Sequence, residues 1–295
     1  MSINIISKIK KIYEDNGNII QYLRQANNRN TNTIEDILIS YDFQAGSYIN
    51  FVTTNPDYIE KYSTNIANLM SKMGGGNILE VGCGEATTLN AVSKKLAKNY
   101  VFFGFDISWS RIKVANEYLN SQNNSANLFL ADLFKIPLPN NSIDIVYTSH
   151  SIEPNGGREK EALESLYRIT KKYLVLLEPA FEFANDEGKE RMKKNGYITK
   201  LLDTIKELGY NLILHEKATI AANPLNPTGI YIIKKDNYTE ENCLHENIFN
   251  CPISNTPLIK FEDHYFSKDS LISYPIIGGI PCIFSNYAVL TTKHD

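Results

Sequence analysis

A short apolar run ends in two closely spaced glycines at residues 78–84, which read ILEVGCG. Gly82 and Gly84 carry no side chain, so the backbone of this turn can approach a ligand closely. In an open α/β sheet a ligand binds at the carboxyl ends of the strands, where such a turn would lie. The pattern predicts a nucleotide-like ligand, although Gly-x-Gly alone is shared with nicotinamide-binding domains.

Acidic residues in and after the expected strands narrow the choice of ligand. Glu80 lies inside the first strand, two residues before the first glycine. Asp106 ends the next strand, where a carboxylate can hold both hydroxyls of a ribose. Asp132 ends the third, where it can accept a hydrogen bond from an exocyclic amine such as that of adenine. Thr87 stands where the dinucleotide fingerprint has its third glycine, which disfavours a nicotinamide cofactor.

Three titratable side chains follow the fourth and fifth expected strands and suit the removal of a proton from an acceptor. His150 and Glu153 come after the fourth strand, and Glu178 ends the fifth. An imidazole has an unperturbed pKa of about 6.5, so His150 can act as a base near neutral pH. Glu153 could orient the imidazole or take the proton itself. The alternative is that these residues only shape the loop or contact the cofactor.

Strand-like and helical patterns alternate along the part of the chain that would position these residues. Strands are expected at residues 77–81, 100–105, 127–130, 143–147 and 173–177, with helices between them at 87–97, 110–119 and 159–170. This alternation predicts a doubly wound α/β sheet with parallel strands and crossover helices. Strands at 211–215 and 229–234 have no helix between them, which predicts an antiparallel hairpin at the end of the sheet.

The chain divides into three parts. Residues 1–73 are expected to form an N-terminal helical segment in which 1–26 is helical. Residues 74–236 form the sheet domain, and residues 242–290 form a small β-rich module. Within the sheet domain, the charged segment 181–197 either lies over an acceptor pocket or is a solvated helix face, and a helix over 188–208 is expected to break near Gly196.

Composition and charge limit the classes of partner. Among 295 residues there are 30 Lys plus Arg and 33 Asp plus Glu, so the net charge of −3 lacks the basic excess of proteins that grip long nucleic acids. No apolar run approaches the roughly 18 residues of a membrane helix. The first residues lack the long apolar core of a signal peptide, and the four cysteines form no secreted disulfide framework. We therefore expect a cytoplasmic protein with a small-molecule partner.

Together, these motifs resemble the class I S-adenosylmethionine-dependent methyltransferases of the type 11 kind over about residues 41–234. Residues 138–146 (LPNNSIDIV) resemble that family's lead-in to its fourth strand, and residues 41–48 (YDFQAGSY) resemble its N-terminal cofactor lid. The resemblance implies that the segment at 80–84 wraps the methionine part of the cofactor, that Asp106 binds the ribose, and that the pair at 132–133 contacts the adenine.

The resemblance implies a set of cofactor-binding residues and no metal: Tyr41, Tyr48, Glu80, Gly82, Cys83, Gly84, Asp106, Ile107, Arg111, Asp132, Leu133 and Ser149. Ordinary structural roles stay open for some of them. Asp106 and Asp132 each precede a helix or turn, where an Asp commonly caps the backbone. Tyr41 and Tyr48 have the helical spacing of core residues.

The C-terminal module carries a second resemblance. Residues 251–258 (CPISNTPL), 274–276 (YPI) and 279–281 (GIP) resemble the zinc-ribbon-like proteins of the tRNA-methyltransferase activator family. A tetrahedral zinc site needs four ligands, but Ser254 stands where the second cysteine of that pattern would be. Candidate replacements are Cys243, His245, Cys251 and Cys282, whose spacing fits no known pattern. We expect a metal-free module that covers the sheet edge, shapes the acceptor pocket or forms a homodimer contact.

Three functions are open on this basis. The first is O- or N-methylation of a metabolite such as a sugar or glycan precursor. The second is methylation of RNA or a translation factor, which a basic strip beside the pocket would favour. The third is a non-catalytic protein that keeps the cofactor fold.

Overall fold

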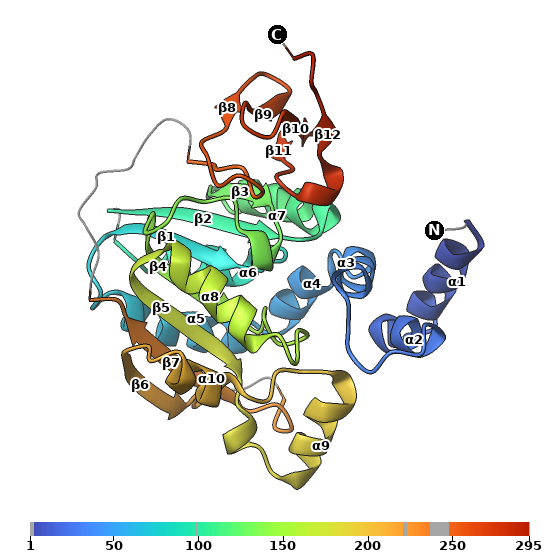
Figure 1. Ribbon diagram of the computed structural model, residues 1–295. Coiled ribbons are helices and arrows are strands. Elements are labelled where there is room, and N and C mark those ends of the chain that lie inside the picture. The colour runs from blue at the N-terminus through green and yellow to red at the C-terminus, as the bar shows by residue number, and fades with distance from the viewer. Residues whose placement is uncertain (1–2, 98, 221–222, 237–247, 295) are drawn as a thin grey trace.

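The computed structural model describes residues 3–97, 99–220, 223–236 and 248–294. Its centre is a seven-stranded sheet in the order β3-β2-β1-β4-β5-β7-β6 (Figure 1). The parallel strands are β1 (Gly76–Val81), β2 (Tyr100–Asp106), β3 (Asn127–Leu130), β4 (Ile143–Ser149) and β5 (Thr170–Pro179). Strands β6 (Leu212–Lys217) and β7 (Thr228–Lys234) are antiparallel to each other, and β7 is antiparallel to β5. The predicted α/β fold and the terminal hairpin are both confirmed.

Helices cover both faces of the sheet, which explains the apolar runs in its strands. One face carries α5 (Pro56–Met70), α6 (Thr87–Ser93) and α7 (Trp109–Ser121), and the other carries α8 (Glu159–Ile169) and α10 (Leu201–Glu207). Successive side chains of a strand point to opposite faces. Accordingly, Ile78 belongs to the same apolar cluster as Ile66 of α5, whereas Leu79 belongs to the cluster that includes Leu163 of α8. The two faces of the sheet are therefore buried under helices, whereas the carboxyl ends of its parallel strands can hold a site.

The N-terminal segment is helical, but residues 3–26 form two helices instead of one. These are α1 (Ile3–Glu14) and α2 (Ile19–Ala26), and the chain turns between them at Asn16, whose φ is 57°. Asn18 then caps α2 by accepting a hydrogen bond from the backbone of Gln21. Helices α3 (Ile34–Phe43) and α4 (Ser47–Thr54) follow and lead into α5.

Helix α9 (Asp186–Asn195) ends at Gly196, whose φ of 69° is the left-handed conformation that glycine adopts freely. This confirms the predicted break before α10. Short 3₁₀ turns complete the domain at η1 (Leu133–Lys135) and η2 (Phe181–Phe183).

The C-terminal module is a small antiparallel sheet at the β3 edge of the central sheet. It consists of β8 (Ile259–Lys260), β9 (His264–Ser267), β10 (Ile272–Ile277), β11 (Ile280–Pro281) and β12 (Val289–Leu290), with the 3₁₀ turn η3 (Ser285–Tyr287). Cys282 forms a parallel bridge with Leu130 of β3, and the backbone nitrogen of Ile283 donates to the Leu130 carbonyl at 3.0 Å. The module therefore covers the sheet edge, as expected, because an open edge would leave backbone groups unpaired.

Two of the four candidate zinc ligands, Cys243 and His245, lie outside the described residues. Cys251 is buried, and its sulfur lies 3.4 Å from the Ser270 hydroxyl and 3.3 Å from the Tyr274 hydroxyl. Within the described ranges, no three His, Cys, Asp or Glu side chains are grouped so as to hold a metal ion. Hydroxyl groups thus surround the one cysteine of the motif.

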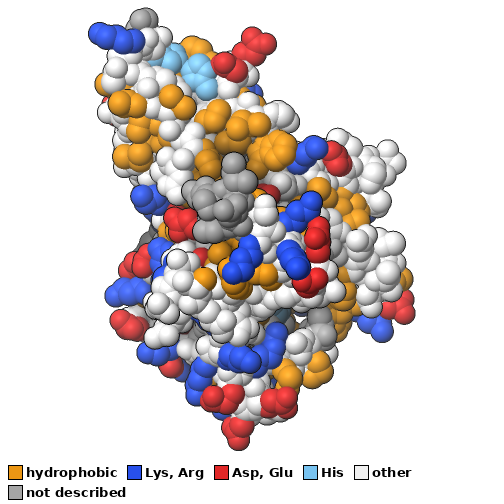
Figure 2. Space-filling view, turned by 90° about the vertical axis from the view of Figure 1, so that its right-hand side faces the viewer, with side chains coloured by type: hydrophobic (Ala, Val, Ile, Leu, Met, Phe, Trp, Pro, Cys, Tyr) orange, Lys and Arg blue, Asp and Glu red, His pale blue; other side chains and the backbone are white. Residues whose placement is uncertain are grey.

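Hydrophobic side chains gather on the C-terminal module (Figure 2). Its most exposed large apolar residues are Ile253, Ile277, Val289 and Leu290. Over the lower part of the same view, Lys and Arg side chains are interspersed with Asp and Glu (Figure 2). None of the helices that the structure describes is both long enough and apolar enough to cross a membrane.

Candidate active site

A cavity of about 720 Å³ lies at the carboxyl ends of the first four strands. Every residue of the predicted cofactor set lines it, and so do His150 and Glu153. Glu178 is fully buried and is not among the lining residues. The cavity gathers these side chains because the carboxyl ends of parallel strands meet at one edge of the sheet.

The glycine turn after β1 has a backbone that other residues would not adopt easily. Gly82 and Gly84 have φ values of 62° and 54°. A Cβ atom on Gly82 would lie 2.4 Å from the Cβ of Ser151, which is far closer than carbon atoms can approach. Glycine at this position therefore lets the turn pack against the loop that follows β4 and keeps the cavity wall free of side chains.

The two aspartates at the strand ends differ in their structural roles. Asp106 accepts hydrogen bonds from the backbone nitrogens of Gly84, at 3.0 Å, and Ser108, at 2.9 Å. Ser108, not Asp106, is the N-cap of α7, so the capping alternative for Asp106 is wrong. Asp132 does cap η1, by accepting from the backbone nitrogen of Phe134, while it also lines the cavity. Burial raises the pKa of Asp132 above its ordinary value.

Glu80 is a buried acid that lines the cavity. Its Oε2 accepts a hydrogen bond of 2.8 Å from the Tyr147 hydroxyl. Burial raises the pKa of Glu80 to about 8, although the hydrogen bond from Tyr147 opposes this rise. The Glu80 carboxyl is therefore mostly protonated near neutral pH, and it can donate as well as accept hydrogen bonds.

We expect stability to fall as the pH rises from about 4.5 to about 8, in part because of Glu80. In this window the unfolded chain releases the Glu80 proton, since the ordinary pKa is 4.5, while the folded chain retains it. Folding then binds a proton, so each rise in pH favours the unfolded state. Burial also raises the pKa of Glu178 to about 7, so Glu178 adds to the same slope.

Glu80→Gln is expected to flatten this dependence without abolishing it. The free energy of unfolding should be measured in denaturant from pH 5 to pH 9 for wild type, for Glu80→Gln and for the exposed control Glu117→Gln. The control should follow the wild-type curve. Parallel curves for wild type and Glu80→Gln would show that Glu80 is not a raised buried acid.

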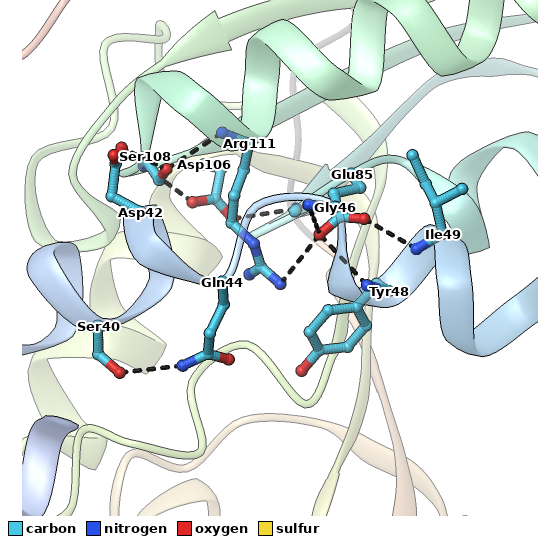
Figure 3. Close-up of polar contacts among 11 residues, drawn as sticks. Ser40, Asp42, Gln44, Gly46, Tyr48, Ile49, Glu85, Asp106, Ser108 and Arg111 are labelled. Carbon is cyan, nitrogen blue, oxygen red and sulfur yellow. Dashed lines mark hydrogen bonds and ion pairs between the residues drawn. The ribbon is translucent and has the colours of Figure 1, made fainter. Parts of the chain in front are cut away.

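A buried glutamate next to the glycine turn holds the N-terminal segment over the cavity. The Glu85 carboxylate accepts hydrogen bonds from the backbone nitrogens of Gly46, Tyr48 and Ile49 at 3.0, 3.3 and 2.8 Å (Figure 3). These nitrogens belong to the first turn of α4, where the helix dipole favours a negative charge. Glu85 therefore connects the turn after β1 to the segment that resembles a lid.

Arg111 lies beneath the same segment, and two of its side-chain nitrogens have no hydrogen-bond partner among the described residues. Its guanidinium group lies 4.9 Å from the ring centre of Tyr41 and 4.6 Å from that of Tyr48. One of its nitrogens is 3.9 Å from Glu85 (Figure 3). Arg111 is 5% exposed, and its Nε and Nη2 atoms have no hydrogen-bond partner among the described residues. Because unpaired buried donors are costly, these atoms suit a ligand that accepts hydrogen bonds.

Asp42 makes a second connection of this kind, between α3 and the start of α7. Asp42 accepts hydrogen bonds of 2.8 Å from the hydroxyls of Ser108 and Ser110. Figure 3 shows Asp42 and Glu85 on opposite sides of Arg111. Neither Asp42 nor Glu85 was in the predicted site, because a hydrogen bond to a group far away in the sequence leaves no sequence signal.

His150 and Glu153 form a hydrogen-bonded pair at the other end of the site. The Nδ1 atom of His150 lies 2.8 Å from Glu153 Oε2, and its Nε2 atom lies 2.7 Å from the Thr228 hydroxyl. His150 has a φ of 54°, so the loop is held in an unusual conformation at this residue. Burial lowers the pKa of His150, but the hydrogen bond and charge of Glu153 and the charge of Glu178 together raise it by more, and the net shift is upward.

The surroundings of Glu153 include two residues that the sequence did not suggest. The Asn226 amide nitrogen lies 3.3 Å from both Glu153 oxygens. Tyr197 also lines the cavity, and burial together with the charge of Glu153 raises its pKa. Of the charged segment 181–197, Tyr197 is the lining residue. Glu178 lies behind this group, where it accepts from the backbone nitrogens at 151 and 152.

Aromatic side chains from α4 and α5 line the neighbouring wall. Tyr58 stacks on Tyr62 with ring centres 5.6 Å apart, and Phe51 meets Tyr58 edge-on at 5.5 Å. The Tyr62 hydroxyl is 2.8 Å from the Ser149 hydroxyl, which joins this wall to the loop that carries His150. The site therefore combines a polar pair with aromatic faces.

Comparison with known proteins shows what the sheet domain is similar to. Residues 78–173 match a family described as a methyltransferase domain. No curated protein sequence matches the chain. A solved structure of a putative S-adenosyl-L-methionine-dependent methyltransferase from Methanococcus maripaludis is similar, with a TM-score of 0.51 and 17% identity over 68% of this chain and 96% of that one.

A second similar structure is magnesium protoporphyrin IX methyltransferase from Synechocystis PCC 6803 with bound SAH, with a TM-score of 0.48 and 13% identity over 60% of this chain and 83% of that one. The likeness to the Methanococcus maripaludis structure shows the fold, and the family match covers the glycine turn and both aspartates at the strand ends. Residues 78–173 therefore match a methyltransferase domain, and the chain shares the Rossmann-like fold of the Methanococcus maripaludis structure.

Proposed function

We propose that the protein transfers a methyl group from S-adenosylmethionine to a small-molecule acceptor that binds beside His150 and Glu153. The observation that carries the proposal is that one cavity is lined by the cofactor motif and by this polar pair. Proximity of this kind lets a protein align two reactants and exclude water from them.

The residues present suit this cofactor. The glycine turn leaves the wall beside β1 open, and the Nε and Nη2 atoms of Arg111, which have no hydrogen-bond partner among the described residues, suit a carboxylate. A carboxylate has about four acceptor positions, so Asp106 retains capacity for ribose hydroxyls besides its two backbone partners. Asp132 retains capacity for an adenine amine in the same way. When bound, S-adenosylmethionine supplies an electrophilic methyl group on a positively charged sulfur.

The three predicted catalytic residues have different roles at the end of the cavity beside His150 and Glu153, which we call the acceptor end. Glu153 lines the cavity and has lone pairs left to bind an acceptor hydrogen. His150 has both ring nitrogens engaged, so we assign it the positioning of Glu153. Glu178 holds the intervening loop through its backbone nitrogens. A proton lost from a hydroxyl or amine would pass to the Glu153–His150 pair.

A metabolite is favoured over RNA or a translation factor as the acceptor. Arg111 is the one Lys or Arg side chain among the described residues that line the cavity. Figure 2 shows basic and acidic side chains interspersed over the lower part of the face in view, whereas nucleic acid would favour a basic strip. O- or N-methylation of a metabolite, a cytoplasmic location and a homodimer contact through the C-terminal module are parts of this proposal.

Calorimetric titration with S-adenosylhomocysteine tests the proposal, with NAD⁺ as the control ligand. S-adenosylhomocysteine is expected to bind and NAD⁺ is not. His150→Ala is expected to keep the wild-type affinity for S-adenosylhomocysteine, because His150 lies at the acceptor end, and to lower turnover once a substrate is known. Binding of NAD⁺ alone would overturn the assignment, and full turnover in His150→Ala would remove His150 from the acceptor site.

A further inference from the structure

The charged side chains of the cavity are unevenly distributed. Its acidic lining residues are Glu80, Glu85, Asp106, Asp132 and Glu153, whereas its one Lys or Arg among the described residues is Arg111. Arg111 lies between the rings of Tyr41 and Tyr48 and beside Glu85, so it belongs to the cofactor end. At the acceptor end, the charged groups are the carboxylate of Glu153 and the imidazole of His150, which contact each other.

This distribution leaves an anionic acceptor with the His150 imidazole as its one possible counter-charge at this end, and both ring nitrogens of His150 are already engaged by Glu153 and Thr228. A phosphate or carboxylate at this end would be taken out of water beside Glu153, and no Lys or Arg of the described lining would face it. Removing an anion from water without a counter-charge that can donate hydrogen bonds to it is strongly unfavourable, and a nearby like charge adds to the cost. Nucleotide-sugars and other phosphorylated acceptors are therefore disfavoured.

The same end is well suited to a cation. The Glu153 side chain is 12% exposed, and it is fixed by His150 and Asn226 so that its position is set before a ligand arrives. The Tyr58 and Tyr62 rings are stacked on the wall of the same cavity. Aromatic faces attract cations, and an ammonium donates charge-assisted hydrogen bonds to a carboxylate.

We propose that the methyl acceptor is a basic amine, which enters as an ammonium ion and binds to Glu153. This inference rests on the proposed function and narrows its acceptor to N-methylation. The ammonium gives one proton to Glu153 and becomes a neutral amine. The nitrogen lone pair then forms a bond to the methyl carbon as the carbon–sulfur bond breaks, and the sulfur keeps the electron pair of that bond. The product is the protonated N-methylamine.

The proposal is tested by binding of three probes that share a phenyl ring and differ in charge. Protein saturated with S-adenosylhomocysteine is titrated with 2-phenylethylamine, 2-phenylethanol and 3-phenylpropanoate, and binding is followed by saturation-transfer NMR. The amine is expected to bind, and the carboxylate is not. Glu153→Gln keeps the size of the side chain and should weaken amine binding roughly tenfold or more, whereas the surface variant Glu117→Gln should not change it.

The outcomes separate this inference from the proposed function. If S-adenosylhomocysteine itself fails to bind, the proposed function falls. If it binds but the amine shows no advantage over the carboxylate, whether both probes bind or neither does, the amine proposal is overturned. Equal amine binding by wild type and Glu153→Gln also overturns it. Unchanged affinity of Glu153→Gln for S-adenosylhomocysteine shows that the variant is folded.

Discussion

Glu85→Ala is expected to weaken the binding of S-adenosylhomocysteine roughly 10- to 100-fold, which corresponds to about 1.4–2.8 kcal/mol. Glu85 is 1% exposed and accepts from three backbone nitrogens in the first turn of α4. Alanine removes all three acceptors, and each buried donor left unpaired costs about 1–3 kcal/mol before water compensates for it. It also removes the nearest carboxylate from Arg111, which lies 3.9 Å away.

Glu85→Ala should destabilise residues 41–48, the segment that resembles a cofactor lid, before it destabilises the rest of the fold. Hydrogen exchange at the amides of Gly46, Tyr48 and Ile49 should accelerate in Glu85→Ala, while exchange in β1 and β4 should not. Glu85→Gln retains one acceptor oxygen but loses the charge that favours a helix N-terminus, so it should fall between wild type and Glu85→Ala. Unchanged exchange at these three amides, together with unchanged affinity, would show that Glu85 does not hold the lid.

The sheet and the strand-end residues were readable from the sequence because both depend on local patterns. Buried parallel strands appear as apolar runs, and their carboxyl ends meet at one edge. Asp106 and Asp132 could therefore be placed at the same cavity from their positions alone, as the structure confirms. The antiparallel hairpin was readable for the related reason that no helix separates its two strands.

The hydrogen bonds between segments that are far apart in the chain could not be predicted from the sequence. Glu85 binds backbone nitrogens that lie 36 to 39 positions earlier in the chain, and backbone groups are the same in every residue. Asp42 binds Ser108 and Ser110, which lie 66 and 68 positions later in the chain, and nothing in the residue types links them. Thr228 reaches His150 only because β7 lies next to β5 in the sheet. Such contacts depend on packing, which the sequence pattern does not specify.

The break between α1 and α2 was also not predicted, although the sequence does contain a signal for it. Asn16 and Gly17 form an Asn-Gly pair, which commonly marks a turn, and Asn18 is a favoured helix cap. The apolar residues of α1 and α2 fit one helical repeat, and this repeat hid the local signal. In the structure the turn brings residues of α2 to the cavity, where Ile19 and Ile20 line it.

Asp106→Ala is expected to weaken S-adenosylhomocysteine binding by about 1–3 kcal/mol, through loss of charge-assisted hydrogen bonds to the ribose. Affinity alone is not decisive, because Asp106 also accepts from the backbone nitrogens of Gly84 and Ser108. Asp106→Asn keeps one acceptor oxygen for these neighbours. It should therefore lose less stability than Asp106→Ala while still losing affinity.

A double-mutant cycle isolates the ribose contact, because it compares loss of the protein group with loss of the ligand group. The ligands are 5′-methylthioadenosine and its 2′-deoxy analogue, titrated into wild type, Asp106→Ala and Asp132→Ala. Loss of the hydroxyl should cost affinity in wild type and in Asp132→Ala, whose missing carboxylate is assigned to the adenine. It should cost little in Asp106→Ala, because the partner of the hydroxyl is already gone. An equal cost in all three proteins would mean that Asp106 supports the glycine turn and does not bind the ribose.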